Sequence, residues 1–468
     1  MSHILQLKER RKRIFLSCLL FLLMTLFLPA AGQSTAPAVP DAEKASGVEA
    51  LDLSDTSKAQ QKLNAMSADE VARYLADPKA PQFSWALAAL RKKGEAAIPH
   101  LIRLMSRDDL GFGWTAPAEA LLSIGDKSLP SLIDLLKGDS QTARRSAAWA
   151  LMKRNKPCKD AIAPLIEVLK GKDESAAGHA AAALAPNGKD AAEAVPHLIP
   201  LAFKITARTH APCLAVEAIG LDPTLIPNVI EHVAAVSGEP KADALRLHVG
   251  ARLLAASGKD CAAALAEALG HKSRTVRLAA AQAIQKIGKQ AKTEAVEKAL
   301  NAAVADDATR IDAAAALVAI GASAKAAVPG LIKDLESGRV DMLATTNFRY
   351  TCRAAEVLAL IPEAVPALIE GLRSDKEIVR IGCVWAMPTD KATAKQVVPK
   401  IKELLARSTS QEEQELVVAK LYQLDPDWVR QAAAGGPESR PDWPPRHWHQ
   451  VASRVAAAAK AEAKKAAE

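Results

Sequence analysis

The stretch "AIGASAKAAVPGLIKDLESG", residues 319–338, holds two helix-breaking residues inside an alanine-rich, apolar sequence. Upstream of it, apolar residues recur at spacings of three and four as far as Ile320, which predicts a helix. Asp307 is expected to cap the start of that helix. Gly321 supplies the left-handed conformation that commonly ends a helix, and Pro329 suits the first turn of a second helix, where its missing N–H is least harmful. The stretch therefore predicts two helices joined by a short turn.

A proline followed by an aliphatic pair recurs along the chain at steps of 31 to 37 residues, with one step of 102 that spans three periods. The prolines are Pro99, Pro130, Pro164, Pro196, Pro227, Pro329, Pro366 and Pro399. A fixed period of this length is typical of stacked repeats, in which one helix pair cannot bury both of its apolar faces alone. We therefore predict an all-α fold, a right-handed α-solenoid of about eleven stacked helix pairs over residues 58–437. The capping box "SADE", Ser67 to Glu70, opens the first helix.

Composition favours the same fold. Of the 468 residues, 49% are hydrophobic but only 4% are aromatic. Many thin, alanine-rich helical contacts fit these proportions better than one thick core. The chain also has no convincing series of strands, which need alternating β-branched and aromatic residues.

Both ends of the chain differ from the repeats. Basic residues precede an apolar run at 14–28, and small residues follow it, so residues 1–32 read as an export signal. The run has 15 residues, fewer than the roughly 20 needed to cross a bilayer as a helix. We expect an exported protein, periplasmic, cell-envelope or secreted, with a membrane attachment only if the signal is retained as an anchor. Residues 33–57 are expected to form a disordered linker, and residues 438–468 a Pro/Trp-containing tail with a C-terminal Ala/Lys helix.

Net charge argues against nucleic acid as the partner. The formal charge is +8, and the leader carries five bases and one acid, which leaves about +4 for the rest. Phosphate binding needs a concentrated basic face, because affinity comes from released counterions. A mild excess spread over the chain is not that signal.

The unit "TVRLAAAQAIQKIG", together with "AVPGLIKDL", resembles the HEAT repeats, and more closely the HEAT-like repeats of the phycobilisome lyase type. The resemblance implies a charged ladder between repeats, formed by arginines of the first helices and aspartates a few residues ahead of them. The arginines are Arg144 or Arg145, Arg277, Arg310, Arg349 and Arg380, and the aspartates are Asp139, Asp307 and Asp375. The resemblance is specific for the fold and says little about activity.

Some enzymes are built on HEAT-like repeats, so the alternative function is a lyase or oxygenase, or a regulatory subunit of one. Iron-dependent hydroxylases with such repeats bind metal through His-Glu dipeptides, and this chain has none. His179, His210 and His248 fall at similar positions of successive first helices. Such positions lie about 8–10 Å apart, whereas zinc ligands lie near 2 Å from the ion. We expect no metal and no cofactor.

Five cysteines follow the leader: Cys158, Cys213, Cys261, Cys352 and Cys383. Their spacing fits neither a zinc site nor a small disulfide framework. We interpret them as buried, small hydrophobic residues.

The position after the aliphatic pair of each second helix is acidic in the centre of the array. It is occupied by Asp134, Glu167, Glu231 and Glu267, and interrupted by Pro200. Second helices usually line the concave face of such arrays. One hypothesis is that this acidic ridge recognises a basic or polar partner by charge complementarity; the alternative is an ordinary solvated helix face.

The tail contains "DWPPRHWH", with Trp443, Arg446 and Trp448. Trp and Arg dominate binding hot spots, so these residues are a second candidate contact for a partner. The alternative is that the segment covers the last repeat, because terminal units of an array need caps. The leading functional hypothesis is a non-enzymatic, exported scaffold or adaptor for an unidentified protein partner.

Overall fold

The computed structural model describes residues 55–434, apart from 78, 111–112, 205–209, 236–237 and 337–351, together with residues 51 and 457. The chain divides into two compact units, Met1–Ala59 and Gln60–Glu468. The described helices belong to the second unit, except for the start of the first helix.

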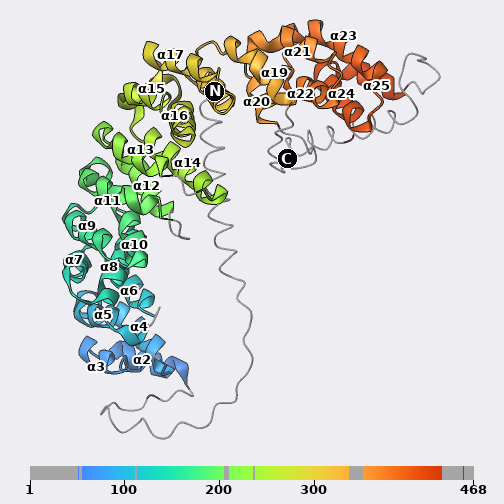
Figure 1. The fold of residues 1–468 in the computed structure, drawn as a ribbon. Coiled ribbons are helices and arrows are strands. Elements are labelled where there is room, and N and C mark those ends of the chain that lie inside the picture. Colours follow the sequence, from blue (N-terminus) through green and yellow to red (C-terminus); the bar gives the residue numbers. More distant parts are fainter. Residues whose placement is uncertain are drawn as a thin grey trace. The chain divides into compact units, whose positions relative to one another are not determined.

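Every regular element among the described residues is a helix, which confirms the all-α prediction (Figure 1). The first helices of the pairs are α2 (Thr56–Ala65), α4 (Gln82–Arg91), α6 (Thr115–Ile124), α8 (Gln141–Arg154), α10 (Glu174–Leu184), α12 (His210–Ile219), α14 (Pro240–Ala255), α16 (Arg274–Ile287), α18 (Arg310–Ile320), α20 (Arg353–Leu358), α22 (Glu377–Ala386) and α24 (Gln411–Leu424). The second helices are α3 (Ala68–Arg73), α5 (Ile98–Met105), α7 (Leu129–Lys137), α9 (Ile162–Lys170), α11 (Val195–Ala202), α13 (Ile226–Ala234), α15 (Ala262–Ala268), α17 (Glu294–Ala303), α19 (Val328–Glu336), α21 (Val365–Gly371), α23 (Lys391–Arg407) and α25 (Pro426–Ala434).

The helix pairs stack in chain order. Each first helix from α4 to α22 contacts the first helix of the next pair, and second helices contact one another from α5 through α13, from α15 to α17 and from α19 through α23. Among the described residues, eleven pairs run from α4 to α25, after the short pair α2 and α3. The predicted solenoid of about eleven pairs is therefore confirmed.

The turn that decided the fold forms as the sequence predicts. Gly321 ends α18 in the left-handed conformation, with φ of 74°, and Pro329 is the second residue of α19. The expected cap is wrong, because α18 begins only at Arg310. Thr309 is the N-cap residue and makes no side-chain hydrogen bond to the helix, while the carboxylate of Asp306 accepts the backbone N–H of Ala308 in the preceding turn, at 3.0 Å.

The capping box predicted at Ser67 is present, since Ser67 and Glu70 each accept the other's backbone N–H. The core contains many alanines beside its leucines, as the composition suggests: in α16, Ala279, Ala280 and Ala281 are completely buried. Helices approach closely where side chains are small, as in protein interiors generally. None of the described helices has the length and apolar content needed to span a membrane.

Candidate interaction surface

The four acids of the predicted ridge take equivalent places on stacked second helices. Asp134 lies on α7, Glu167 on α9, Glu231 on α13 and Glu267 on α15, and all four are exposed. Between them α11 presents Pro200, which is also exposed and lies inside the helix. The structure thus brings the acids to one layer of helices, interrupted at α11.

Half of this ridge is compensated by its own helices. The carboxylate of Asp134 lies 3.7 Å from the amine of Lys137, and that of Glu167 lies 2.7 Å from the amine of Lys170. Exposed ion pairs of this kind are worth little energetically, but they reduce the local negative charge. Glu231 makes no ion pair with a residue that the structure describes, and the same holds for Glu267. The uncompensated charge of the ridge therefore lies on α13 and α15.

Two open grooves lie between repeats, and sequence patterns did not indicate them. One, of about 750 Å³, is lined by the ends of α7 and α9 and the starts of α8 and α10, and includes Glu167, Lys170 and Arg144. The other, of about 650 Å³, is lined by Pro329, Pro366 and neighbouring residues of three successive repeats. Groove shape depends on how repeats pack, which a helical pattern does not reveal.

The tail residues Trp443, Arg446 and Trp448 lie outside the described residues, so their role stays a prediction. Arg349 of the expected arginine ladder is also outside them.

Arginines of several first helices tie their repeats to the preceding turn. Four of them donate a hydrogen bond to the backbone carbonyl six residues earlier in the chain. The pairs are Arg144 to Gly138 at 2.6 Å, Arg277 to His271 at 3.0 Å, Arg310 to Val304 at 3.1 Å and Arg380 to Ser374 at 2.9 Å. Cations near the last carbonyls of a helix are favourable, because those carbonyls lack helical partners.

The ladder also links successive repeats, as the family resemblance implied. Arg145 pairs with Asp173 at 2.7 Å, Arg277 with Asp306 at 2.9 Å and Arg380 with Glu413 at 2.6 Å. Each of these acids lies at or near the start of the next first helix, where the positive end of the helix dipole favours an anion.

The acids of this ladder are not the predicted ones. Asp307 pairs with Arg310 inside its own repeat. Asp375 makes no ion pair with a described residue, and its backbone carbonyl accepts a hydrogen bond from Arg380 at 3.0 Å. Asp139 makes no ion pair with a described residue. Which acid meets an arginine depends on how the next repeat packs, so the spacing within one repeat was misleading.

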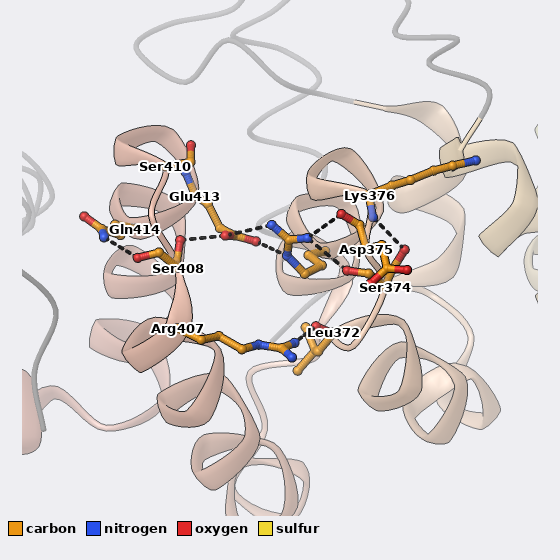
Figure 2. Close-up of polar contacts among 10 residues, drawn as sticks. Leu372, Ser374, Asp375, Lys376, Arg407, Ser408, Ser410, Glu413 and Gln414 are labelled. Atoms are coloured by element: carbon orange, nitrogen blue, oxygen red, sulfur yellow. Dashed lines mark hydrogen bonds and ion pairs between the residues drawn. The ribbon is translucent and has the colours of Figure 1, made fainter.

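The junction around Glu413 is the most buried part of the ladder (Figure 2). The side chain of Glu413 is 1% exposed and accepts hydrogen bonds from Arg380 and from the Ser408 hydroxyl, the latter at 2.6 Å. Figure 2 shows Glu413 on one helix facing the turn that carries Ser374 and Asp375. The hydrogen bond to Glu413 raises the pKa of Arg380.

In the equivalent junction at α10, Asp173 accepts the backbone N–H groups of Ser175 and Ala176 as well as Arg145. Burial raises the pKa of this carboxyl, but the hydrogen bonds from Arg145 and from the Ala176 backbone outweigh it and leave the pKa below its usual value. Both junctions join a first helix to the first helix of the next repeat through an ion pair.

His179, His210 and His248, which the sequence places at similar positions of successive first helices, are not joined by further metal-ligating side chains among the described residues. Among the described residues, no cluster of three or more histidine, cysteine or acidic side chains could hold a metal ion. Burial, with the nearby charges of Arg252 and Lys286, lowers the pKa of His248. Of the cysteines, Cys213, Cys261 and Cys383 are buried as predicted, whereas Cys158 and Cys352 are half-buried.

Residues 143–171 match the model of the PBS lyase HEAT-like repeat. Among solved structures, the chain is similar to the karyopherin Kap121p in three complexes, with 13% identity in each. In the complex with the extreme C-terminus of the protein phosphatase Cdc14p, the TM-score is 0.51, and the match covers 79% of this chain and 47% of that one. In the complexes with Nup53p and with the SUMO protease Ulp1p, the TM-score is 0.50, and each match covers 79% of this chain and 46% of the karyopherin chain. No curated protein sequence matches this chain.

These likenesses concern the fold, since the identity is low, and the chain spans about half the length of the karyopherin chains it matches. Together with the stacked helix pairs and the matched repeat, they identify the array as HEAT-like.

Proposed function

Taking the chain as a stack of HEAT-like repeats, we propose that it is a non-enzymatic scaffold or adaptor that holds a protein partner in an exported compartment. The observation that supports this function most is the exposed row of acids on stacked second helices. A continuous array of short helices offers a long surface on which equivalent positions recur at each repeat. Charged groups at such positions set the specificity and speed of association.

The chemistry of the row defines the partner. Glu231 and Glu267 carry charge that no described neighbour compensates, whereas Lys137 and Lys170 accompany the other two acids. A partner segment with basic residues opposite α13 and α15 and mixed polar residues opposite α7 and α9 would fit this pattern.

The karyopherin structures support protein binding by a stack of this fold. In these structures Kap121p is bound to the extreme C-terminus of the protein phosphatase Cdc14p or to Nup53p. This chain shares the fold with them, and we propose that it shares the use of an α-solenoid surface for protein contacts, with a different partner.

Capture from envelope extracts tests the proposal. Immobilised full chain and a Glu231→Lys/Glu267→Lys variant are compared by mass spectrometry of the bound proteins. A matched control carries Glu119→Lys and Glu174→Lys, two exposed acids of first helices. We expect a defined set of proteins to be lost in the first variant and kept in the control. Equal capture by all three proteins would remove the acidic row from the proposal.

The competing enzymatic function remains tied to the PBS lyase-type repeat at 143–171. Metal analysis and visible absorbance of the chain purified from its native source separate the two functions. Stoichiometric iron or a bound pigment would favour an enzyme or a regulatory subunit over a scaffold.

Export is the other part of the proposal, and it is supported by the basic and apolar pattern of residues 1–32. Cell fractionation and determination of the mature N-terminus test it. Recovery of the intact chain from the cytoplasm alone would contradict export.

A further inference from the structure

Lysines gather on the turns that join the first and second helices of three successive repeats. The turns contain η7 (Gly258–Cys261), η8 (Gly288–Ala291) and η9 (Lys325–Ala327). We call the five exposed lysines on and beside them the lysine edge: Lys259, Lys286, Lys289, Lys292 and Lys325. Residues 258–261, 286–292 and 321–327 contain only one acid, Asp260.

Contacts between the turns show that these lysines form one surface. The turns η7 and η8 contact each other, and η8 contacts α18. The amine of Lys292 donates a hydrogen bond to the carbonyl of Gly321 at 3.1 Å. A Cβ at Gly321 would lie 3.9 Å from Cε of Lys289. Lysines of one repeat therefore reach the turn of the next.

The positive charge of the lysine edge is not neutralised by ion pairs among the described residues. Lys259, Lys286, Lys289 and Lys325 make no ion pair with a residue that the structure describes. Glu294, at the start of α17, is the nearest acid in sequence after Lys292.

The corresponding turns nearer the start of the array differ. There Glu95 and Asp126 follow the turn glycines, and they pair with Lys127 and Arg154 of the following repeats. The positive excess is therefore local to the turns from η7 to η9 and is not a general property of turns in this chain.

We propose that the lysine edge is a contact surface for an anionic membrane, and that it holds this part of the array against negatively charged lipid headgroups. Polybasic segments bind such surfaces electrostatically, and each lysine near the surface strengthens binding about fivefold. Between the lysines the turns carry the small residues Gly258, Gly288, Ala322 and Ser323. The hydroxyl of Ser323 donates a hydrogen bond to Glu363 at 3.1 Å, so one carboxylate lies beside η9 and the five lysines still give the edge a positive excess.

Lysine chemistry favours this occupant over nucleic acid. An ammonium group is a point charge on a flexible stem, without the planar fork that arginine uses for bidentate phosphate recognition. The three turns also contain no aromatic residue on which a base could stack. A diffuse anionic surface needs neither feature.

The test measures binding of the full chain to phosphatidylcholine vesicles with and without phosphatidylglycerol, by co-sedimentation. The variant Lys259→Glu/Lys289→Glu/Lys325→Glu removes the charge of all three turns. A matched control, Lys172→Glu/Lys241→Glu/Lys272→Glu, makes the same change in net charge at exposed lysines near the turns between repeats. Both variants keep residues 1–32, so any contribution of the leader is common to them.

We expect binding that requires phosphatidylglycerol, weakens with salt and falls about 100-fold in the first variant, while the control keeps the wild-type affinity. Circular dichroism checks that both variants remain helical. Equal binding to neutral vesicles, an equal loss in the control, or no vesicle binding by the wild type would each overturn the proposal. Binding of an oligonucleotide or polyglutamate through the same lysines, without vesicle binding, would assign the edge to another polyanion.

Discussion

Replacing Arg380 with methionine should destabilise the last repeats strongly, because it strands a buried carboxylate. The side chain of Glu413 is 1% exposed. Its carboxylate accepts hydrogen bonds from Nε and Nη2 of Arg380, at 2.6 and 3.1 Å. After the substitution, the carboxylate of Glu413 keeps one side-chain hydrogen-bond donor among these residues, the hydroxyl of Ser408. Removing one member of a buried ion pair typically costs about 3–5 kcal/mol. We expect a loss of about 3 kcal/mol, since one hydrogen bond to the carboxylate survives.

A double variant separates the ion pair from simple packing loss. Arg380→Met combined with Glu413→Leu replaces the pair by apolar residues, a change that is often close to neutral. The double variant should therefore be more stable than Arg380→Met alone. The matched control is Arg430→Met, which removes an ion pair with Asp427 whose side chains are 61% and 81% exposed, and it should change stability by less than about 1 kcal/mol.

Native-state hydrogen exchange, followed by mass spectrometry of peptides from α22 and α24, is the appropriate assay. Repeat arrays can unfold in parts, so a single global unfolding energy is not well defined for them. A loss of less than about 1 kcal/mol in the protection of these helices in Arg380→Met would show that Glu413 is not stranded by the substitution. Simple addition of the effects of Arg380→Met and Glu413→Leu would show that the two residues are not coupled.

Three further predictions concern stability. Gly330→Ala should destabilise the array by about 2 kcal/mol, because the added Cβ would overlap Nε of the buried Arg310. Hydrogen exchange in α19 measures this loss of stability, which should be smaller in an Arg310→Ala background. Gly321→Ala should cost about 1 kcal/mol in the same assay, since φ is +74° there. Burial lowers the pKa of Lys420 to about 8 from 10.5, so between these values the unfolded chain binds more protons than the folded one. Exchange measured from pH 8 to pH 10 should therefore show the wild type gaining about 2 kcal/mol of stability relative to Lys420→Met.

The helix pairs could be predicted from sequence because their signals are local. A left-handed glycine and a proline in the first turn act within a few residues, and Gly321 and Pro329 do so in the structure. The cap at Asp307 failed because α18 begins three residues later, at Arg310, with Thr309 at the N-cap position and no side chain accepting a backbone N–H of the helix. The spacing of apolar residues does not fix the first residue of a helix that closely.

Of the polar contacts between repeats, the arginines could be predicted from the sequence but their acidic partners could not. The arginines sit at recurring positions of the first helices, so Arg277 and Arg380 were identified. Their partners Asp306 and Glu413 come from the next repeat, and their identity depends on how the helices stack. No pattern within a single repeat carries that information.

For the acidic ridge, the exposure of its side chains was easier to predict than the net charge that remains after pairing with neighbouring lysines. The position after the aliphatic pair lies opposite the buried stripe of a helix, so Glu167 is exposed as expected. Its compensation by Lys170 follows from a spacing of three residues on one helix, and the same sequence reading could have found it. The lysine edge could not be found in this way, because it needs the contact between turns that the sequence places about 30 residues apart.

The arrangement of charges separates stability from recognition. The arginine ladder lies where one repeat meets the next, and in its junction at α24 the side chains are largely withdrawn from solvent, at 17% exposure for Arg380 and 1% for Glu413. Glu231 and Lys259 are exposed and make no ion pair with described residues, so substitutions there should leave stability within about 0.5 kcal/mol. A loss of partner or vesicle binding at those positions can then be attributed to the lost contact, whereas a loss at Arg380 would mix binding with unfolding.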